Sequence, residues 1–280
     1  MAQNLATKYS DKVDERYKLR SLTDSAVNQD YDWAGVSTVV VYNVAAGTIG
    51  NYTRSGNTRY GSASDLGTTT TSYTLSRDRA FTFVIDRGDW SESQYVTEAG
   101  RALARTIDEA VVPEIDMYRL GVFNHSAHTT KQHSTDVSAV TTSNAYAVFL
   151  DVNAILDNNK VPQVGRIAFI TPAYYNAIKR DSSFSKNSDL AYTDLKNGQV
   201  GEVDGVALIK VPSSYMPYDT DLIIVHPTAT VAPLKLEDYK IHDNPPGING
   251  WLVEGRFIYD AFVLTAKTGA IGIHSTTPSS

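Results

Sequence analysis

The chain has 280 residues, enough for one large domain or two ordinary ones, and its 25 Lys and Arg against 31 Asp and Glu give a formal net charge of -6 at pH 7. An acidic chain of this kind lacks the excess of positive charge with which proteins bind nucleic acid. The absence of cysteine excludes disulfide bonds and thiolate metal sites. No apolar run approaches the roughly 20 residues of a membrane span, and the N-terminal sequence is too polar for a signal peptide, so we expect synthesis in a cytoplasm.

The first expected elements are an N-terminal arm over residues 1–36, which has no strong apolar period, and a long β-hairpin over residues 37–86. The strands STVVVYNV (37–44) and AFTFVID (80–86) flank a polar excursion rich in Gly, Ser, Thr and Asn, and we expect these two strands to pair. A lone hairpin has no core to offset its ordering entropy. We therefore expect it to be ordered by lying on another subunit; the alternative is a disordered surface loop.

A single long helix is predicted next, from Ser93 to Leu120. Its apolar side recurs at steps of three and four and consists of Val96, Gly100, Leu103, Ile107, Ala110, Val111, Ile115 and Tyr118. The other side carries Glu98, Arg101, Arg105, Asp108, Asp116 and Arg119, and Arg105 can pair weakly with Glu109 one turn later. Pro113 removes the hydrogen bond to the carbonyl of Glu109, at a cost of about 3 kcal/mol unless the helix bends. The apolar stripe continues through Pro113, which favours one kinked helix over two helices that meet there.

The second half of the chain alternates helices with short strands. The expected elements are an amphipathic helix over 143–159, a buried strand at 165–171 that enters a helix at Pro172, a hairpin with its turn at Asp204-Gly205, a buried strand at 221–225, and two or three strands within 250–274. Segregated helices and antiparallel hairpins indicate an α+β fold.

The sequence contains no convincing catalytic, metal-binding or phosphate-binding motif. His125, His128 and His133 lie close together in NHSAHTTKQH, but this Ser/Thr-rich segment reads as a loop without supporting carboxylates, so solvated histidines are favoured over a zinc site. No phosphate-binding glycine loop, nucleophile elbow or convincing carboxylate pair occurs. We therefore expect no cofactor and no enzymatic activity.

The order of these parts resembles the major capsid proteins of tailed bacteriophages with the Hong Kong 97-type fold. The resemblance is carried by STVVVYNV, GNYTRSGNTRYG, LSRDRAFTFVIDRGDWSES, VVPEIDMYRL, ITPAYYNAIKRDSSF, NGQVGEVDGVALIKVPSSYMP and IYDAFVLTAKTGAIG, which span nearly the whole chain. It implies an N-terminal arm (1–36), an extended E-loop hairpin with flanking strands (37–86), a peripheral domain with a spine helix (87–124), an axial domain (125–230), and return strands of both domains (231–280).

The function that this resemblance implies is structural. It implies a coat subunit that self-assembles as pentamers and hexamers into an icosahedral shell around bacteriophage DNA, which it contacts without sequence specificity. It implies assembly in the host bacterial cytoplasm, a final place in the virion, no membrane, and a scaffolding protein, a portal and decoration proteins as further partners. The alternative is a surface adhesin or receptor-binding module, but such proteins usually consist of many short strands without a long helix.

Charged residues are expected at the contacts between subunits. The hairpin side of these contacts is Arg54, Arg59, Arg77 and Arg79, and the expected partners on a neighbouring spine helix are Asp108, Glu109, Glu114 and Asp116. Each exposed pair is worth only about 0–1 kcal/mol, so the shell is held by many weak contacts that add up. Pro113 is expected to bend the spine helix, so that one chain can fit different local curvatures.

Two further expectations concern maturation. The type member of the resembling family joins subunits by an isopeptide bond from an E-loop lysine, whereas here no lysine occurs between Lys18 and Lys131, so a shell without covalent cross-links is expected. The arm is too short to contain a scaffolding domain, so we expect either a separate scaffold protein or none.

Overall fold

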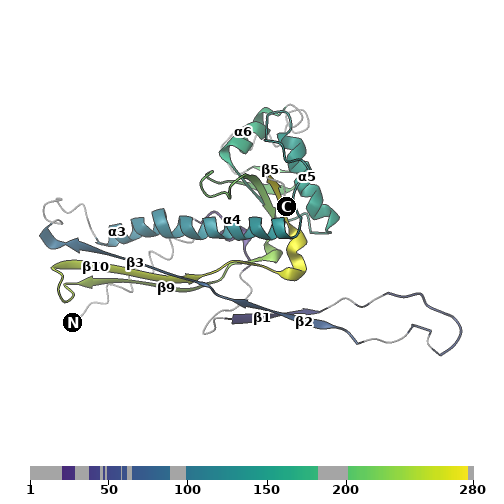
Figure 1. The fold of residues 1–280 in the computed structure, drawn as a ribbon, viewed down its shortest axis with the longest axis horizontal. Coiled ribbons are helices and arrows are strands. Elements are labelled where there is room, and N and C mark those ends of the chain that lie inside the picture. The colour runs from purple at the N-terminus through teal and green to yellow at the C-terminus, as the bar shows by residue number, and fades with distance from the viewer. Residues whose placement is uncertain are drawn as a thin grey trace. The chain divides into compact units, whose positions relative to one another are not determined.

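The computed structural model describes residues 21–28, 38–88 except 45, 46, 48, 58 and 62–64, then 99–181 and 201–276. The chain divides into two compact units, shown in Figure 1. Residues Trp33–Leu75 form the hairpin unit, and Met1–Asp32 together with Ser76–Ser280 form the main unit. Among the described helices, none combines the length and the apolar character that crossing a bilayer requires. The finer division into five segments stays a prediction.

One continuous helix dominates the main unit. α3 (Ala99–Thr106), a π-helical turn (Ile107–Val111) and α4 (Val112–Thr129) follow one another without a break, and Figure 1 shows them as one rod along β3, β9 and β10. In the π-turn the Val112 amide donates to the carbonyl of Ile107, five residues back. The prediction of a single helix through Pro113 is confirmed from Ala99 onward, and the helix runs beyond its expected end at Leu120. The expected first turns from Ser93, with Val96 and Glu98, lie outside the described residues. The local irregularity is a π-turn immediately before the proline, a recognised way for a helix to absorb a distortion.

The π-turn changes which side of the helix is buried. It adds one residue to a turn, which rotates all later side chains by about 100° relative to an uninterrupted α-helix. After it, the buried side chains are Val112, Ile115, Asp116, Arg119, Leu120, Phe123 and Ala127. The expected apolar stripe holds beyond the turn for Ile115, which is buried, and for Tyr118, which is half-buried and packs against the core. It is wrong for Ala110 in the turn, which is exposed, and the expected solvent side is wrong for Asp116 and Arg119, which are buried. The sequence reading assumed a constant period of 3.6 residues, and the inserted residue breaks it.

A three-stranded antiparallel sheet lies against the first part of this helix. Its order is β3 (Arg77–Asp86), β10 (Gly250–Tyr259) and β9 (Leu234–Asp243). The buried cluster between sheet and helix consists of Leu103, Ile107, Val111, Val112, Ile115, Tyr239, Val253, Phe257 and Tyr259. Gly255 in the middle strand leaves room for its neighbours, because a Cβ at this position would force the rings of Phe81 and Tyr239 to shift.

The hairpin unit is built from a different strand pair than expected. β1 (Thr38–Val44) pairs antiparallel with β2 (Thr68–Thr74), the threonine-rich segment that was assigned to the polar excursion. The expected pairing of residues 37–44 with 80–86 is wrong, because the latter belong to β3 and pair with β10. Two physical reasons account for the difference. Threonine is β-branched and favours strands despite its polarity, whereas the phenylalanines of β3 require the covered sheet face that the main unit provides.

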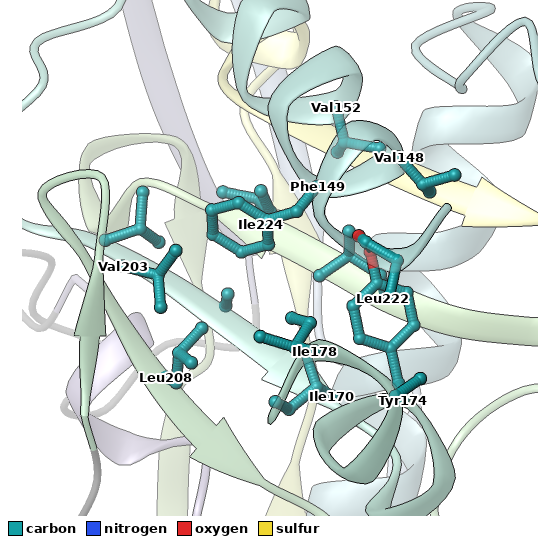
Figure 2. Packing of buried hydrophobic residues seen from close by; sticks show 14 of the residues in the cluster. Val148, Phe149, Val152, Ile170, Tyr174, Ile178, Val203, Leu208, Leu222 and Ile224 are labelled. Carbon is teal, nitrogen blue, oxygen red and sulfur yellow. Dashed lines mark hydrogen bonds between the residues drawn. The ribbon is translucent and has the colours of Figure 1, made fainter. Parts of the chain in front are cut away.

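A second sheet has five strands in the order β12 (Ile271–Ser275), β7 (Thr220–Val225), β4 (Arg166–Ile170), β6 (Val206–Lys210) and β5 (Glu202–Val203). α5 (Ala145–Asn158) and α6 (Pro172–Arg180) cover one face, as Figure 2 shows for Phe149 and Val152 over the sheet residues Leu222 and Ile224. The later part of α4 packs on the opposite face through Leu120, Phe123 and Ala127. The predicted helices, strands and Asp204-Gly205 turn are confirmed, and both turn residues have positive φ, 51° and 74°.

Part of the expected N-terminal arm belongs to the core. Ala26 and Val27 are buried among α4 and the five-stranded sheet, and the Asn28 amide donates to the Thr230 carbonyl at 2.8 Å. Residues 21–28 of the expected arm therefore pack on the main unit, residues 1–20 and 29–37 lie outside the described part, and the arm over residues 1–36 stays a prediction. The remaining small elements are the 3-10 turns η1 (Asp24–Ala26), η3 (Pro227–Ala229) and η4 (Thr265–Ala270), and the pair β8 (Thr230–Val231) with β11 (Phe262–Val263).

The histidine segment is helical where a loop was expected. His125 and His128 lie in the last turns of α4, and the ring centroids of His128 and His133 are 6.3 Å apart. Within the described ranges, no group of three or more potential ligands is placed to hold a metal ion. Burial, followed by the neighbouring His133 and His125, lowers the pKa of His128.

His274 on β12 is a fully buried imidazole. It is 0% exposed, and within the described part of the chain neither ring nitrogen has a partner at hydrogen-bond geometry. Burial lowers its pKa below the ordinary value of 6.5, although the carboxylates of Asp221 and Asp136 and the nearby backbone of Ser138 and Asp136 act in the opposite direction. The folded chain therefore holds this ring neutral.

This geometry predicts an acid-dependent loss of stability. Because the unfolded chain binds the His274 proton more readily than the folded chain, the contribution of His274 is complete above pH 6.5 and declines as the pH falls below that value. We expect His274→Phe, which keeps a ring of similar size, to flatten the decline of Tm between pH 7 and pH 5. The exposed His125→Phe is the matched control and is expected to keep the wild-type slope. Equal slopes for His274→Phe and the wild type would contradict the prediction.

Candidate assembly surfaces

The hairpin unit exposes a row of apolar side chains. Val40, Tyr42 and Val44 lie opposite Ser72, Thr70 and Thr68 in the β1–β2 ladder. Their exposed fractions are 46%, 73% and 57%. The segment between the strands also exposes Ile49, Tyr52, Tyr60 and Leu66. Apolar side chains gathered on one small unit are typical of a surface that another molecule covers.

The segment that joins β1 and β2 contains a closed turn with two arginines. The Thr53 amide donates to the Arg59 carbonyl at 2.9 Å, and the rings of Tyr52 and Tyr60 meet edge to face at 5.0 Å. Arg54 and Arg59 are both exposed. The turn therefore presents two positive charges, as the sequence predicted for the outer part of the hairpin.

Arg79 has its partner on the helix of its own chain. Its Nε donates to Glu114 Oε1 at 2.7 Å, and the Tyr259 hydroxyl donates to the same oxygen at 3.0 Å. Arg77 lies over the Tyr118 ring, with its guanidinium carbon 4.6 Å from the centroid. Arg79 and Glu114 are thus paired within one chain, because β3 lies in the main unit beside the helix and not in the hairpin. Their predicted contacts with a neighbouring subunit stay a prediction.

Asp116 is closed off from any neighbour. It is 1% exposed, and its carboxylate accepts hydrogen bonds from the Ser21 hydroxyl at 2.7 Å, the Leu22 amide at 2.9 Å and the Thr23 hydroxyl at 2.6 Å. Arg119, which lies one helical turn after Asp116, is also buried, and its Nη1 donates to Asp24 Oδ1 at 2.6 Å. The π-turn rotates the Asp116 side chain toward residues 21–24, so Asp116 is engaged within its own chain, and its predicted contact with a neighbouring subunit stays a prediction.

Among the acidic residues expected on the spine helix, Glu109 points outward. It is exposed and forms the predicted pair with Arg105, at 3.8 Å. Asp108 is half-buried. Arg54, Arg59 and Glu109 thus remain exposed candidates for contacts between subunits, whereas Arg79, Glu114 and Asp116 are engaged within the chain.

The sequence reading missed a polar centre at the start of β3. Asp260, 3% exposed, accepts hydrogen bonds at Oδ2 from the Ser76 amide (2.7 Å) and the Ser76 hydroxyl (2.9 Å). Its Oδ1 accepts from the Tyr118 hydroxyl and from the Ala261 amide, both at 2.8 Å. The available signal was a lone acid inside the apolar run FIYDAFVL, since a buried carboxylate needs several donors.

Comparisons with known proteins identify the fold. No protein-family model and no curated protein matches the chain. A chain from Mycobacterium phage Che8 superposes with a TM-score of 0.68 at 18% identity, covering 93% of this chain and 92% of that one. A chain from the capsid of Cyanophage P-SCSP1u gives 0.64 at 14%, covering 88% and 85%. A chain from the mature capsid of bacteriophage PhiM1 gives 0.64 at 10%, covering 91% and 86%.

The chain has a phage-capsid fold. This confirms the predicted α+β capsid architecture, because the similarity runs through nearly the whole length of both chains. These structures share the arrangement of the backbone with this chain at 10–18% sequence identity. The similarity therefore establishes the fold and does not identify individual contact residues.

Buried Asp116 and exposed Glu109 on the same helix are expected to contribute differently to stability. Asp116→Ala removes the acceptor for three hydrogen bonds from residues 21–23, and we expect it to lower the free energy of unfolding by about 3–5 kcal/mol. Glu109→Ala is the control, and the loss of its exposed pair with Arg105 is expected to cost less than about 0.5 kcal/mol. Urea denaturation of the unassembled subunit measures both. Similar small losses for the two variants would show that the buried network does not stabilise the main unit.

Proposed function

We propose that this chain is the major capsid subunit of a tailed bacteriophage, which assembles with copies of itself into an icosahedral shell around DNA. The observation that carries the proposal is the end-to-end likeness to chains from phage capsids, with 91% of this chain matched to the mature capsid of PhiM1. The match runs through nearly the whole of both chains, so it concerns the fold as a whole and not one segment of it.

The hairpin unit supports self-assembly. A two-stranded ribbon is marginal in water, and this one exposes its apolar row and the aromatic turn. A surface of this kind gains stability when a second subunit covers it. Since every copy of the chain carries both a hairpin and a main unit, contacts from one copy to the next can close into pentameric and hexameric rings.

Charge supports the same arrangement. The chain is acidic overall, with a net charge of -6, yet the hairpin turn presents Arg54 and Arg59. A neighbouring copy with an exposed Glu109 offers a partner of opposite sign. Each such pair is worth about 0–1 kcal/mol, so incorrect placements dissociate readily while a complete shell accumulates many contacts.

Pro113 follows the π-turn at the point where the helix passes from one sheet to the other. We assign it the role of a compliant point that lets the same chain fit slightly different curvatures, because the missing amide donor weakens the helix there. The remaining partners in this proposal are a portal, decoration proteins, packaged DNA contacted without sequence specificity, and either a separate scaffolding protein or none. The chain acts in the virion after assembly in a bacterial cytoplasm, and it is not an enzyme.

A surface adhesin or receptor-binding module is not supported. Such proteins usually consist of many short strands, whereas the continuous helix from Ala99 to Thr129 is the central element here. The capsid fold and the exposed hairpin both follow from the shell proposal without further assumptions.

Assembly itself is the decisive test. The purified full-length chain, expressed alone and together with a scaffold gene from the same genome, is expected to form closed particles in at least one of the two preparations. Size-exclusion chromatography and negative-stain microscopy detect them. A chain that stays a stable monomer in both preparations would refute the proposal.

Charge variants test the hairpin contacts. Arg59→Glu is expected to lower particle yield at least several-fold while leaving the circular dichroism and Tm of the unassembled subunit unchanged, because Arg59 is exposed on the hairpin turn. Arg59→Lys keeps the charge and is the matched control, with a yield near that of the wild type. Normal yields for Arg59→Glu and for the corresponding Arg54→Glu would remove the arginines from the contact.

A further inference from the structure

The boundary between the two compact units coincides with the polar centre around Asp260. The hairpin unit ends at Leu75, and Ser76 is the first residue of the main unit that follows it. Only Leu75 and Ser76 separate β2 from β3. The residue at which the hairpin strand enters the main unit is thus the residue that Asp260 holds.

The Asp260 carboxylate accepts hydrogen bonds from both the backbone amide and the side-chain hydroxyl of Ser76. Its Oδ2 accepts from the amide at 2.7 Å and from the hydroxyl at 2.9 Å. Burying a carboxylate costs several kcal/mol unless donors surround it, and Ser76, Tyr118 and Ala261 supply them. Hydrogen bonds to an ionised acceptor are among the stronger ones in proteins. A single backbone amide in a ladder would hold the strand far less firmly.

The same centre is tied to the spine helix. Tyr118 on α4 donates its hydroxyl to Asp260 Oδ1 at 2.8 Å, and its ring packs edge to face against Tyr259 with centroids 5.5 Å apart. Burial, followed by the hydrogen bond to Asp260, raises the pKa of the Tyr118 phenol, so the hydroxyl keeps its proton and can donate. Arg77, the residue after Ser76, lies over the same ring. Two consecutive residues at the hairpin root are therefore bound to the helix and to the end of β10.

We infer that Asp260 is a positioning residue, which fixes the root of the hairpin to the spine helix and thereby sets where the hairpin can reach on a neighbouring subunit. The inference rests on the proposed shell function. An anchor at the root is needed because small changes of angle there are magnified along a long ribbon, and an incorrectly aimed hairpin cannot cover the same surface on each neighbour.

Two variants separate this role from simple loss of stability. Asp260→Asn keeps the size of the side chain but replaces one of the two acceptor oxygens with an amide donor. Either the two donors of Ser76 or the donors of Tyr118 and Ala261 therefore lose their acceptor. Ser76→Ala removes only the hydroxyl donor and leaves the core residue in place. Ser72→Ala, an exposed serine in β2 with the same chemical change, is the matched control.

The first measurement is hydrogen exchange on the unassembled full-length subunit. In Asp260→Asn we expect the peptide covering Leu75 to Arg79 to exchange about tenfold faster or more, with a smaller increase in Ser76→Ala, while peptides from α4 and the five-stranded sheet keep their protection. Ser72→Ala is expected to match the wild type. Unchanged exchange at the root in both Asp260→Asn and Ser76→Ala would overturn the inference, and if Asp260→Asn fails to fold, Ser76→Ala alone decides.

The second measurement is particle shape under the conditions in which the wild type forms shells. Variants with a loosened root are expected to give irregular or open particles at unchanged subunit concentration, whereas the wild type gives uniform shells. Uniform shells from a variant whose root exchanges rapidly would overturn the positioning role. A wild type that forms no shells refutes the proposed function instead, and the exchange measurement still reports on the anchor.

Discussion

The main unit depends on one helix that packs against two separate sheets. Its first part lies on β3, β10 and β9 through Ile107 and Val111, and its later part lies on the five-stranded sheet through Leu120 and Phe123. A regular α-helix presents one stripe in one direction, so it cannot meet two sheets that lie on different sides of it. The π-turn at Ile107–Val111 inserts the residue that reorients the later stripe. Pro113 directly follows, where the helical hydrogen bonding is already irregular.

This reorientation determines which charged side chains of the helix are buried. Turning the later stripe inward also buries Asp116 and Arg119, and a buried ion is tolerated only when it is paired and hydrogen-bonded. The chain supplies these partners from residues 21–24, whose hydroxyls, amide and carboxylate meet both side chains. The N-terminal segment therefore becomes part of the core, and the acids that remain for contacts between subunits are those on the first part of the helix.

Local patterns predicted much of this fold, and they failed where distant parts of the chain decide the outcome. The helix through Pro113, the strand before Pro172 and the Asp204-Gly205 turn follow from apolar spacing and turn chemistry alone. The strand at 68–74 was missed because its threonines read as polar, although their β-branching favours strands. Asp260 was missed for a different reason: its donors on Ser76 and Tyr118 lie 184 and 142 residues away, and no local period encodes them.

The two compact units combine opposite physical properties. The main unit is fixed by dense cores and by the hydrogen-bonded carboxylates of Asp116 and Asp260, so its shape changes little under small forces. The hairpin unit has no comparable core, and its apolar row stays open. A closed shell requires this combination, because identical subunits must keep a constant body while they reach neighbours at slightly different angles. The anchor at Asp260 lies at the residue where the rigid part of the chain gives way to the compliant part, and the accuracy of the shell depends on how firmly that one junction is held.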